Sequence, residues 1–596
     1  MGQREYPAGQ EISARFDGVL PTQCSTDRNT DRNTDYCSEP DRTGGDGHTL
    51  LDADEAPIGV SEPPDQASES SLIVRAREGK YGEQESAAVP RLPGAFKELR
   101  TMWQSSQLAW RAFIQLLGRL AKIGAGVLAF GIASRTLGVA RFGNFVVAFA
   151  YVLIFSTIAT FGVDRIVIRD LTQREATQDA HVHLVPISIA TKLLLAGVAM
   201  VLCVIIAAFL QFPGPLILAI ALFSPYILVT SFNSNGLFGS ILQVHGRSIT
   251  IAIASTAAAF VTLGITAIVA LLHRGVNFFL LGYTVAGGVD VLLCFASVRR
   301  LTQLGIKWDT SSVRYLLTQA FPLGVASVFV LTYGRVDTIL LEKLTDPRQV
   351  ALYGVAYKFF DVLSTISATI MVVVYPALSR MYAQGRAAMQ EFYTRVFTWM
   401  LALSLPLTFA IVILRYPLVV LIAGQRFGDA QFALPGLMLA IALIFPSTVA
   451  SYMFVVTRRQ NWNLLLAISA SVWNIGLNLW LIPRGGYVAA AWTTAATEAF
   501  VIIYNVSMIA LKTGFFPSIR VTLSVLLAAL AFGVALIPGM PVYIGGAIGL
   551  VMYFVLLLIL GVFPITYLRQ LVVPAARRGE EAEEIRNCDV VSDVQA

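Results

Sequence analysis

The chain has 596 residues, of which 56% are hydrophobic and 14% are charged, with a formal net charge of +6 and a mean hydropathy of +0.66. A soluble domain carries about 25% charged residues, and a single hydrophobic core stops growing at about 250–300 residues. The composition therefore excludes a water-soluble globular protein. The basic residues form short clusters between long apolar runs, as loops of membrane proteins do, so we expect no nucleic acid as a partner.

Residues 1–100 differ in composition from the chain that follows. They hold 19 of the 38 Asp and Glu residues, 11 Lys and Arg residues and few hydrophobic ones. Such a segment cannot bury enough apolar surface to offset the entropy lost on ordering. We predict a disordered acidic cytoplasmic tail. Its role stays open between a regulatory or partner-binding segment and an extension without a function.

Long apolar runs follow this tail. A helix that crosses about 30 Å of hydrocarbon needs about 20 apolar residues, and these runs are apolar on all faces, unlike the alternating strands of a membrane β-barrel. The predicted fold class is all-α, a polytopic integral membrane protein with about 14 transmembrane helices. The predicted spans are residues 113–133, 144–164, 186–210, 214–233, 249–272, 277–298, 316–341, 350–374, 393–414, 433–456, 462–482, 487–510, 519–537 and 541–563.

The charges of the connecting loops indicate the orientation. Even-numbered loops carry fifteen Lys and Arg residues, and odd-numbered loops carry eight. Because cytoplasmic loops carry an excess of basic residues, we place the even-numbered loops and both termini in the cytoplasm.

An internal repeat relates the two halves of the apolar region. A shift of 208 residues places residues 145–158 on residues 353–366, and most of the paired side chains are identical or chemically similar. An offset of six spans preserves orientation and predicts two six-helix lobes, between which transporters commonly bind their substrate. The predicted parts are transmembrane lobes over 105–310 and 311–515, two additional transmembrane helices over 516–566, and a charged cytoplasmic tail over 567–596.

Two segments resemble the signatures of a known family. SRTLGVARFGNFVVAFAYVLIFSTIATFGVDRIVIRDL, from Ser134 to Leu171, has a short turn with a Gly-aromatic pair before the second span and a Gly, an acid and an Arg at its end. The segment from Arg335 to Tyr382 has an Asp, an apolar run, LYGVAYK and a closing YPALSR. Both are similar to bacterial polysaccharide-export flippases of the multidrug/oligosaccharidyl-lipid/polysaccharide exporter superfamily. The resemblance covers about residues 105–515.

The resemblance implies a flippase of the bacterial cytoplasmic membrane that translocates a polyprenyl-pyrophosphate-linked oligosaccharide for exopolysaccharide or O-antigen-type biosynthesis. It implies alternating access between the lobes, no enzymatic step and no cofactor. Besides the lipid-linked oligosaccharide and membrane lipid, the implied partners are H⁺ or Na⁺, a polysaccharide polymerase and chain-length proteins. The substrate's polar head cannot cross hydrocarbon unaided, so the task needs a polar cleft with cations for the pyrophosphate.

Four cations within the spans are the candidate substrate-binding residues, since intramembrane charges are costly and usually functional. Arg119 and Lys122 lie one turn apart on one face of the first span, where we expect them to bind the pyrophosphate from the cytoplasm. Arg335 and Lys358 fall at similar depth in the seventh and eighth spans, where we expect them to bind the pyrophosphate once the cleft opens to the outer side. Alternatively, the long side chains of Arg119 and Lys122 extend to the lipid head groups of the cytoplasmic leaflet. For Arg335 and Lys358, the alternative is that nearby acidic residues neutralise their charges.

Three acids are the candidate ion-coupling residues. Asp290 and Glu498 lie near mid-membrane with no cation within four residues, and burial there disfavours the charged form of a carboxyl. Such a group suits coupling to a proton or sodium ion, or it fixes helix packing as a neutral acid. Asp361 is the third candidate, with pairing to Lys358 one turn away as the alternative.

Competing functions stay open at this stage. A cation-coupled multidrug exporter of the same superfamily would favour an acidic, aromatic cleft, whereas the embedded cations here favour an anionic substrate. A membrane glycosyltransferase, or a non-transporting scaffold of polysaccharide assembly, is the alternative from another class. We find no large outer loop with a catalytic carboxylate pair and no nucleotide-binding GxxxxGK[ST] loop.

Overall fold

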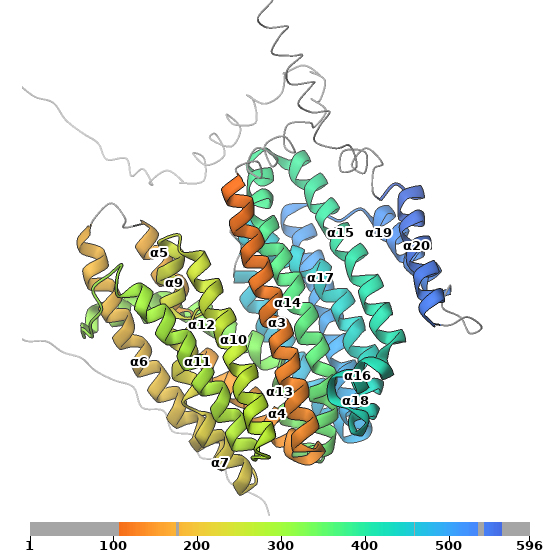
Figure 1. Ribbon diagram of the computed structural model, residues 1–596. Helices are drawn as coiled ribbons and strands as arrows, with labels where there is room; N and C mark the ends of the chain where they lie inside the picture. Colours follow the sequence, from red (N-terminus) through yellow and green to blue (C-terminus); the bar gives the residue numbers. More distant parts are fainter. Residues whose placement is uncertain (1–105, 174–177, 458, 460, 535–541, 563–596) are drawn as a thin grey trace, which may run out of the picture. The chain divides into compact units, whose positions relative to one another are not determined.

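The computed structural model is helical throughout the residues that it describes, 106–173, 178–457, 459, 461–534 and 542–562, and has no strand among them (Figure 1). The predicted all-α class is confirmed. The chain divides into two units, residues 1–91 and 92–596, and every described residue belongs to the second. The tails predicted over residues 1–100 and 567–596 lie outside the described residues.

Nine helices come from the first half of the membrane region. They are α3 (Ser106–Leu137), α4 (Val139–Thr160), α5 (Val163–Gln173), α6 (Gln178–Phe209), α7 (Gly214–Phe223), α8 (Tyr226–Phe232), α9 (Leu237–Val244), α10 (Ser248–Leu271) and α11 (Val276–Val298). The described helices of the second half are α12 (Thr310–Tyr333), α13 (Val336–Leu344), α14 (Pro347–Ala383), α15 (Arg386–Ile413), α16 (Arg415–Ala423), the 3₁₀ helix η1 (Gln425–Phe432), α17 (Leu434–Val456) and α18 (Asn461–Thr513), before α19 (Ile519–Val534) and α20 (Val542–Ile559).

Eleven helical segments among the described residues are long and apolar enough to cross a membrane. One of them, α18, has 53 residues and is interrupted at Gly486, whose φ of 56° is left-handed. It contains the two spans predicted over 462–482 and 487–510, and about 80 Å of helix is far more than one crossing needs. Two shorter apolar helices cover Ile519–Gly533 and Ile544–Ile559. The total of fourteen spans stays a prediction.

Several crossing segments are broken within their length. The α4–α5 segment breaks at Phe161 and Gly162, both with positive φ, and the α12–α13 segment breaks at Gly334 and Arg335. The α8–α9 break is tight, because a Cβ at Gly239 would lie 1.9 Å from the carbonyl oxygen of Ser234. Broken helices are tolerated at membrane depth only where neighbouring protein satisfies the freed backbone groups.

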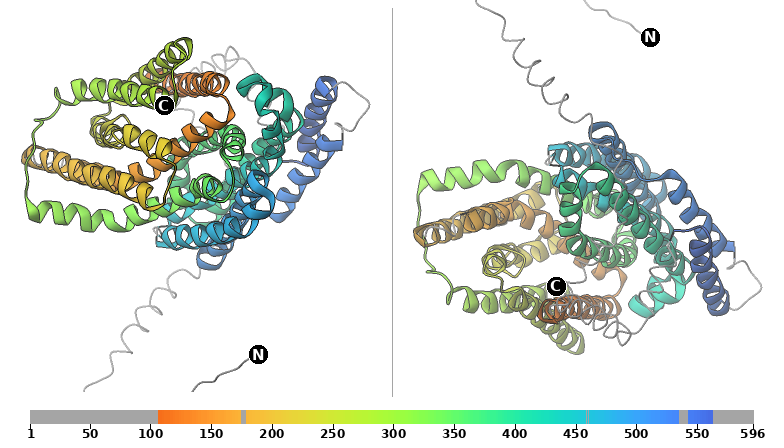
Figure 2. Two further views of the ribbon diagram at one scale, coloured as in Figure 1. Left: turned by 90° about the horizontal axis from the view of Figure 1, so that it is seen from below. Right: turned by 90° about the horizontal axis from the view of Figure 1, so that it is seen from above.

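The two halves of the membrane region meet along α4 and α14. Seen along the helices, the helices before α13 and those after α14 lie largely to opposite sides (Figure 2). A Cβ on Gly354 would lie 2.7 Å from the side chain of Val146. These two positions are exact counterparts under the 208-residue shift, and equivalent residues touch each other only near the axis that relates two repeats. The lobe boundaries themselves stay a prediction.

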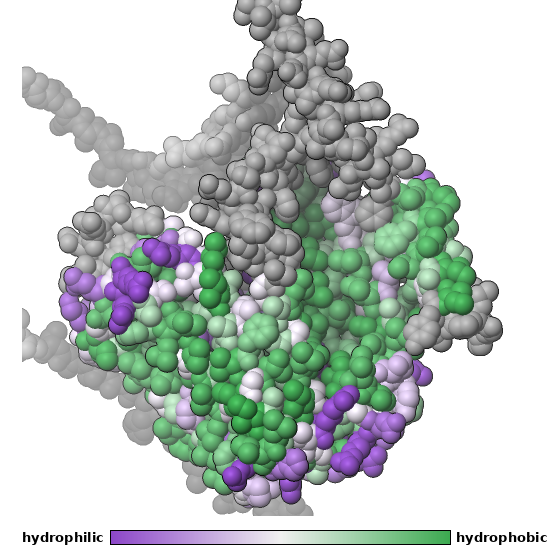
Figure 3. Space-filling model, in the orientation of Figure 1, coloured by the Kyte–Doolittle hydropathy of each residue, from purple (hydrophilic) through white to green (hydrophobic). Residues whose placement is uncertain are grey.

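Polar residues gather toward the two ends of the helices, and an apolar band lies between them (Figure 3). At one end Asp309 begins α12, where its carboxylate accepts hydrogen bonds from the backbone N–H groups of Ser311 and Ser312 at 3.3 and 3.1 Å. The hydroxyls of Ser312 and Ser311 also donate to it, and these bonds lower the pKa of Asp309 to about 2. The N-cap therefore stays charged at any physiological pH.

The contact between α4 and α14 depends on Gly143, where an added Cβ would lie 2.2 Å from the carbonyl oxygen of Pro347. We predict that Gly143→Ala forces these helices apart and lowers the thermal unfolding midpoint of the purified protein. Gly197→Ala on α6 is the matched control, because its Cβ would meet nothing within 4 Å and alanine favours the helix by about 1 kcal/mol. Equal midpoints for the two variants would contradict this account.

Candidate functional site

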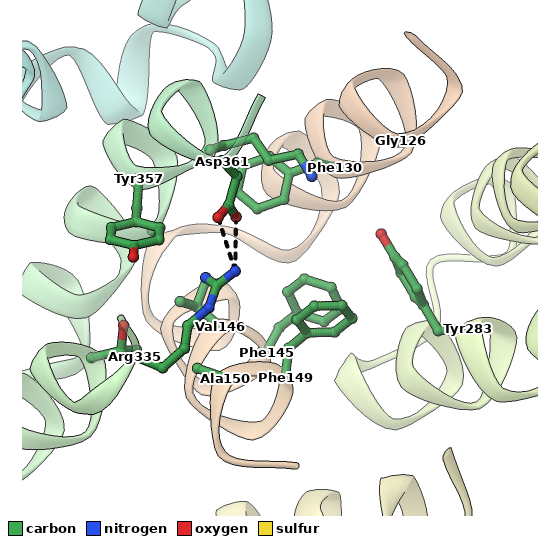
Figure 4. A pocket seen from close by; sticks show the side chains of 13 residues that line it. Gly126, Phe130, Phe145, Val146, Phe149, Ala150, Tyr283, Arg335, Tyr357 and Asp361 are labelled. Atoms are coloured by element: carbon green, nitrogen blue, oxygen red, sulfur yellow. Dashed lines mark hydrogen bonds and ion pairs between the residues drawn. The ribbon is translucent and has the colours of Figure 1, made fainter. Parts of the chain in front are cut away.

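A pocket lies between the two halves of the membrane region (Figure 4), and its empty space of about 640 Å³ includes space that is open to solvent. The helices α3, α4 and α11 form one wall, and α13, α14 and the residue before α13 form the other. The wall from the first half is mainly aromatic and the wall from the second half is mainly charged. The lining residues are Gly126, Phe130, Phe145, Val146, Phe149, Ala150, Tyr283, Arg335, Thr338, Gly354, Tyr357, Lys358 and Asp361.

Arg335 enters the pocket from the break between α12 and α13. Its guanidinium donates from one nitrogen to both carboxylate oxygens of Asp361, at 2.9 and 3.1 Å, and lies 4.9 Å from the ring centroid of Tyr357. The side chains of Arg335 and Asp361 are 19% and 33% exposed. The pair is therefore formed at the pocket surface, and Arg335 keeps other N–H groups for a ligand.

Lys358 lies in the same pocket, near enough to Asp361 for an electrostatic interaction but without a close ion pair. Its ammonium is 5.4 Å from the ring centroid of Phe130, and no ion pair joins it to any residue that the structure describes. Asp361 pairs with Arg335 across helices rather than with Lys358 one turn away. The lining thus has two cations and one carboxylate, an excess of one positive charge, and an anion is the ligand it favours.

Aromatic rings opposite these cations were not anticipated from the sequence. Phe145 and Phe149 stack at 6.1 Å between centroids, and both approach Tyr283 of α11, at 5.9 and 5.4 Å. The i,i+4 spacing of the two phenylalanines was a usable signal for one shared face, but the position of Tyr283 depends on tertiary packing. Flat rings of this kind offer stacking surfaces to a ligand.

A buried polar network lies behind the charged wall. Asp337 is 1% exposed and accepts hydrogen bonds from the backbone N–H of Thr338, at 2.7 Å, and from the Tyr353 hydroxyl. That hydroxyl also lies 3.3 Å from Thr494 of α18. Glu498, one turn further along α18, is 5% exposed and makes no hydrogen bond or ion pair with the described residues. It is a buried carboxyl without a compensating partner.

The remaining predicted site residues form a second group on α3 and α11. Arg119 donates to the Thr369 hydroxyl of α14 at 3.1 Å, and Lys122 interacts electrostatically with Asp290. Asp290 itself accepts a hydrogen bond from Ser234 at 2.7 Å. Gly126, the lining residue of α3 nearest in sequence, is four residues from Lys122, so about 6 Å of helix separates this group from the edge of the pocket. Tertiary structure thus gives Asp290 a neighbouring cation that its own helix lacks.

Sequence reasoning missed a buried ion pair in the first half. The Lys192 ammonium is fully buried in α6 and contacts the Asp164 carboxylate of α5 at 2.6 Å. It also donates to the Ser231 carbonyl oxygen of α8 at 3.2 Å. A single lysine within the apolar run 186–210 was the signal available in the sequence. The pair ties the α4–α5 break to the end of α8, which is a structural role.

Metal ligands are not gathered anywhere in the part of the chain that the structure describes. No group of three or more His, Cys, Asp or Glu residues there is placed to hold a metal ion. Cys203 and Cys294 are buried free thiols.

Comparison with known proteins agrees with the fold. Residues 109–382 match the family described as polysaccharide biosynthesis protein, and residues 322–480 match the MatE family. No curated protein sequence matches the chain. The matched families are transporters.

Solved structures show the same fold at low sequence identity. The lipid II flippase MurJ in an inward closed conformation matches with a TM-score of 0.60 and 11% identity, covering 77% of this chain and 100% of MurJ. An inward-facing multidrug resistance MATE transporter matches at 0.52 and 15% identity, covering 68% and 99%. A Pyrococcus furiosus transporter, described as having a binding pocket of reversed polarity, matches at 0.51 and 16%, covering 67% and 95%.

The two family matches, over residues 109–382 and 322–480, support a place for the chain in the multidrug/oligosaccharidyl-lipid/polysaccharide exporter superfamily. The resemblance to its polysaccharide-export flippases, carried by the segments 134–171 and 335–382, is confirmed by these matches. The protein is a multi-pass membrane transporter.

The Lys192–Asp164 pair gives a prediction about stability. Lys192→Met leaves the Asp164 carboxylate buried without its partner, which typically costs on the order of 3 kcal/mol. We expect a clearly lower thermal unfolding midpoint in detergent for this variant. The double variant Lys192→Met/Asp164→Asn should recover part of the loss, because it buries no unpaired charge. A single variant as stable as the unmodified protein would show that the pair is not needed.

Proposed function

We propose that the protein is a flippase that carries a polyprenyl-pyrophosphate-linked oligosaccharide from the cytoplasmic to the outer leaflet by alternating access. The observation that carries this proposal is the pair of basic groups at two depths between the halves. Lys122 and Lys358 each lack an ion pair with the described residues, and Lys122 lies four residues, about 6 Å of helix, from Gly126 at the edge of the pocket that contains Lys358. A pyrophosphate can pass from one to the other.

In the inward-facing state, Arg119 and Lys122 are the proposed contacts of the pyrophosphate. They lie toward the end of α3 that the loop charges assign to the cytoplasm, and Arg119 donates a hydrogen bond to the neutral Thr369 hydroxyl. A phosphate oxygen is a stronger partner than a hydroxyl for a guanidinium. Binding there would replace the Thr369 contact and free α14 from α3.

In the outward-facing state, Arg335 and Lys358 are the proposed contacts. The rings of Phe145, Phe149 and Tyr283 lie across the same pocket (Figure 4), where they would stack on the apolar faces of sugar rings while the cations hold phosphate. This combination suits a head group that is both anionic and saccharide. The lipid tail would stay in the bilayer.

Release to the outer side requires contacts between the halves to open. The Arg135 guanidinium donates to the carbonyl oxygens of Val420, Leu421 and Ile422 at the end of α16, at 2.6 to 3.3 Å. Phe142 packs edge-on against Phe427 with 5.4 Å between ring centroids. These contacts lie at the end of α3 opposite Arg119. They form the proposed outer gate.

Coupling to H⁺ or Na⁺ is proposed at Asp361, Glu498 and Asp290. Asp361 pairs with Arg335, so a phosphate that binds this guanidinium would leave the carboxylate to bind a proton or sodium ion. Glu498 is buried without a partner among the described residues. Arg335 would then bind the anionic substrate while the neighbouring carboxylate binds a cation, which directly links the movement of the substrate to the movement of the ion.

The remaining proposals concern organisation and location. We place the moving lobes at residues 105–310 and 311–515, with residues 516–566 as added helices, in a bacterial inner membrane with both tails cytoplasmic. A polysaccharide polymerase and chain-length proteins are the proposed protein partners. No covalent chemistry and no cofactor are assigned to the chain.

A cation-coupled multidrug exporter is the second candidate, and the matched MATE fold favours it. The free charge in the pocket argues against it, because Lys358 and Arg335 would repel a cationic drug. A scaffold or glycosyltransferase is the third candidate. It would not need two basic groups at different depths between the halves.

The first test follows the lipid-linked intermediate in a strain without this protein. We expect complete oligosaccharide units to accumulate in the inner leaflet, where an external periodate or lectin probe cannot reach them. Units that reach the outer leaflet unpolymerised would point to the scaffold or enzyme candidate. No accumulation would favour the multidrug exporter.

The second test uses the cations. Arg335→Ala and Lys358→Ala should each reduce polymer export at least tenfold, because a hydrogen bond to a charged group contributes about 1.5–3 kcal/mol and 1.4 kcal/mol is about a tenfold change. The double variant Arg119→Ala/Arg335→Ala should abolish export. Arg348→Ala is the control, since Arg348 is 65% exposed and pairs with Asp429 outside the pocket. Normal export in the double variant, with normal membrane insertion, would refute the assigned substrate site.

A further inference from the structure

A second pocket lies at the opposite end of the second half, far along α14 and α15 from the pocket of Arg335. It encloses about 750 Å³ of space outside atoms, part of it open to solvent. Its walls come from the end of α14, the start of α15, the end of α17 and the end of α18. The lining residues are Tyr382, Gly385, Arg386, Thr457, Arg459, Lys512, Thr513 and Phe515.

The charged residues of this pocket are all basic. Arg386, Arg459 and Lys512 come from three separate segments, and no Asp or Glu is among the lining residues. None of the three forms an ion pair with a residue that the structure describes. Three like charges around one cavity repel one another, so the arrangement is more stable with an anion between them.

Hydrogen bonds hold the segments around the pocket in place, and they leave N–H groups of the basic residues available for a ligand. The Gln390 side chain donates to the Phe516 carbonyl oxygen at 2.5 Å and accepts from its backbone N–H at 3.1 Å. Arg386 reaches the Gly514 carbonyl oxygen at 3.5 Å, and Lys512 lies 5.3 Å from the Trp462 ring centroid. The segment after α18 is thus held against α15.

Apolar side chains adjoin the pocket on the outside of the molecule. Leu511, Phe516 and Ile519 are 77%, 46% and 66% exposed, and in a membrane protein such side chains face acyl chains. A ligand with a phosphate and hydrocarbon chains would contact both surfaces at once. Basic pockets between transmembrane helices on the cytoplasmic side are a recognised mode of binding anionic head groups.

We propose that this pocket binds a phosphate group, with Arg386, Arg459 and Lys512 as its cationic contacts. Two sources carry that group, the head group of an anionic phospholipid and a free phosphate compound. The site is separate from the proposed substrate path. It would hold the ends of α14, α15, α17 and α18 together while other parts of the second half move.

The test uses the full-length purified protein in detergent and native mass spectrometry. We expect phosphatidylglycerol to bind at least tenfold more tightly than zwitterionic phosphatidylcholine. The triple variant Arg386→Gln/Arg459→Gln/Lys512→Gln should lose this preference. The matched control is Arg247→Gln/Arg299→Gln/Arg300→Gln. It removes three exposed cations of the first half from loops predicted to be cytoplasmic, and it should keep the preference for phosphatidylglycerol.

A second measurement distinguishes the two sources of phosphate. If a free phosphate compound is the natural occupant, inorganic phosphate at millimolar concentration should raise the thermal unfolding midpoint and displace phosphatidylglycerol. Binding of phosphatidylglycerol without competition assigns the site to lipid. Both results support the site, provided that the triple variant abolishes the effect.

Two results would overturn the proposal. Equal loss of phosphatidylglycerol binding in the triple variant and in the control would mean diffuse attraction to basic loops. Unchanged binding in the triple variant would exclude the pocket. If the triple variant does not fold, Lys512→Gln alone, at an exposed position, should still weaken phosphatidylglycerol binding severalfold, and no change would refute the site.

Discussion

Hydrocarbon can neither hydrogen-bond a free backbone group nor solvate an isolated charge, and this constraint governs where each polar group of the protein lies. The Arg335–Asp361 pair is the clearest case. Arg335 lies where the α12–α13 segment is interrupted, and Asp361 reaches it from α14 at 2.9 Å. The same arrangement recurs in the first half, where Lys192 pairs with Asp164 beside the α4–α5 break. Helix breaks and embedded charges thus occur together, each within the protein interior.

The two ion pairs differ in what they leave available. Lys192 is fully buried and its second bond goes to a backbone carbonyl, so that pair holds three helices in place. Arg335 and Asp361 are partly exposed in a pocket that also contains Lys358. An anion can compete for Arg335, and the displaced carboxylate then needs a cation. This difference in exposure separates a structural pair from one suited to transport.

The repeat gives the molecule its pocket between the halves. Because α4 and α14 are counterparts and meet at Val146 and Gly354, the surfaces on either side of their contact come from equivalent helices with different side chains. One surface carries Phe145 and Phe149, whose counterparts Tyr353 and Tyr357 are also aromatic. The other surface carries Lys358 and Asp361, which stand where the first half has apolar side chains. The charge of that wall therefore comes from the positions at which the two halves differ.

The sequence by itself determined the apolar helices, the repeat, the resemblance to a flippase family and the positions of four cations within the predicted spans, because these follow from hydropathy over about 20 residues, from spacing and from short motifs. Only the tertiary structure decided the partners. It paired Asp361 with Arg335 instead of Lys358, brought Lys122 to Asp290, placed Tyr283 opposite the cations and buried Lys192 against Asp164. Charge pairing between helices depends on their rotation and depth, and periodicity along a single helix carries no record of either.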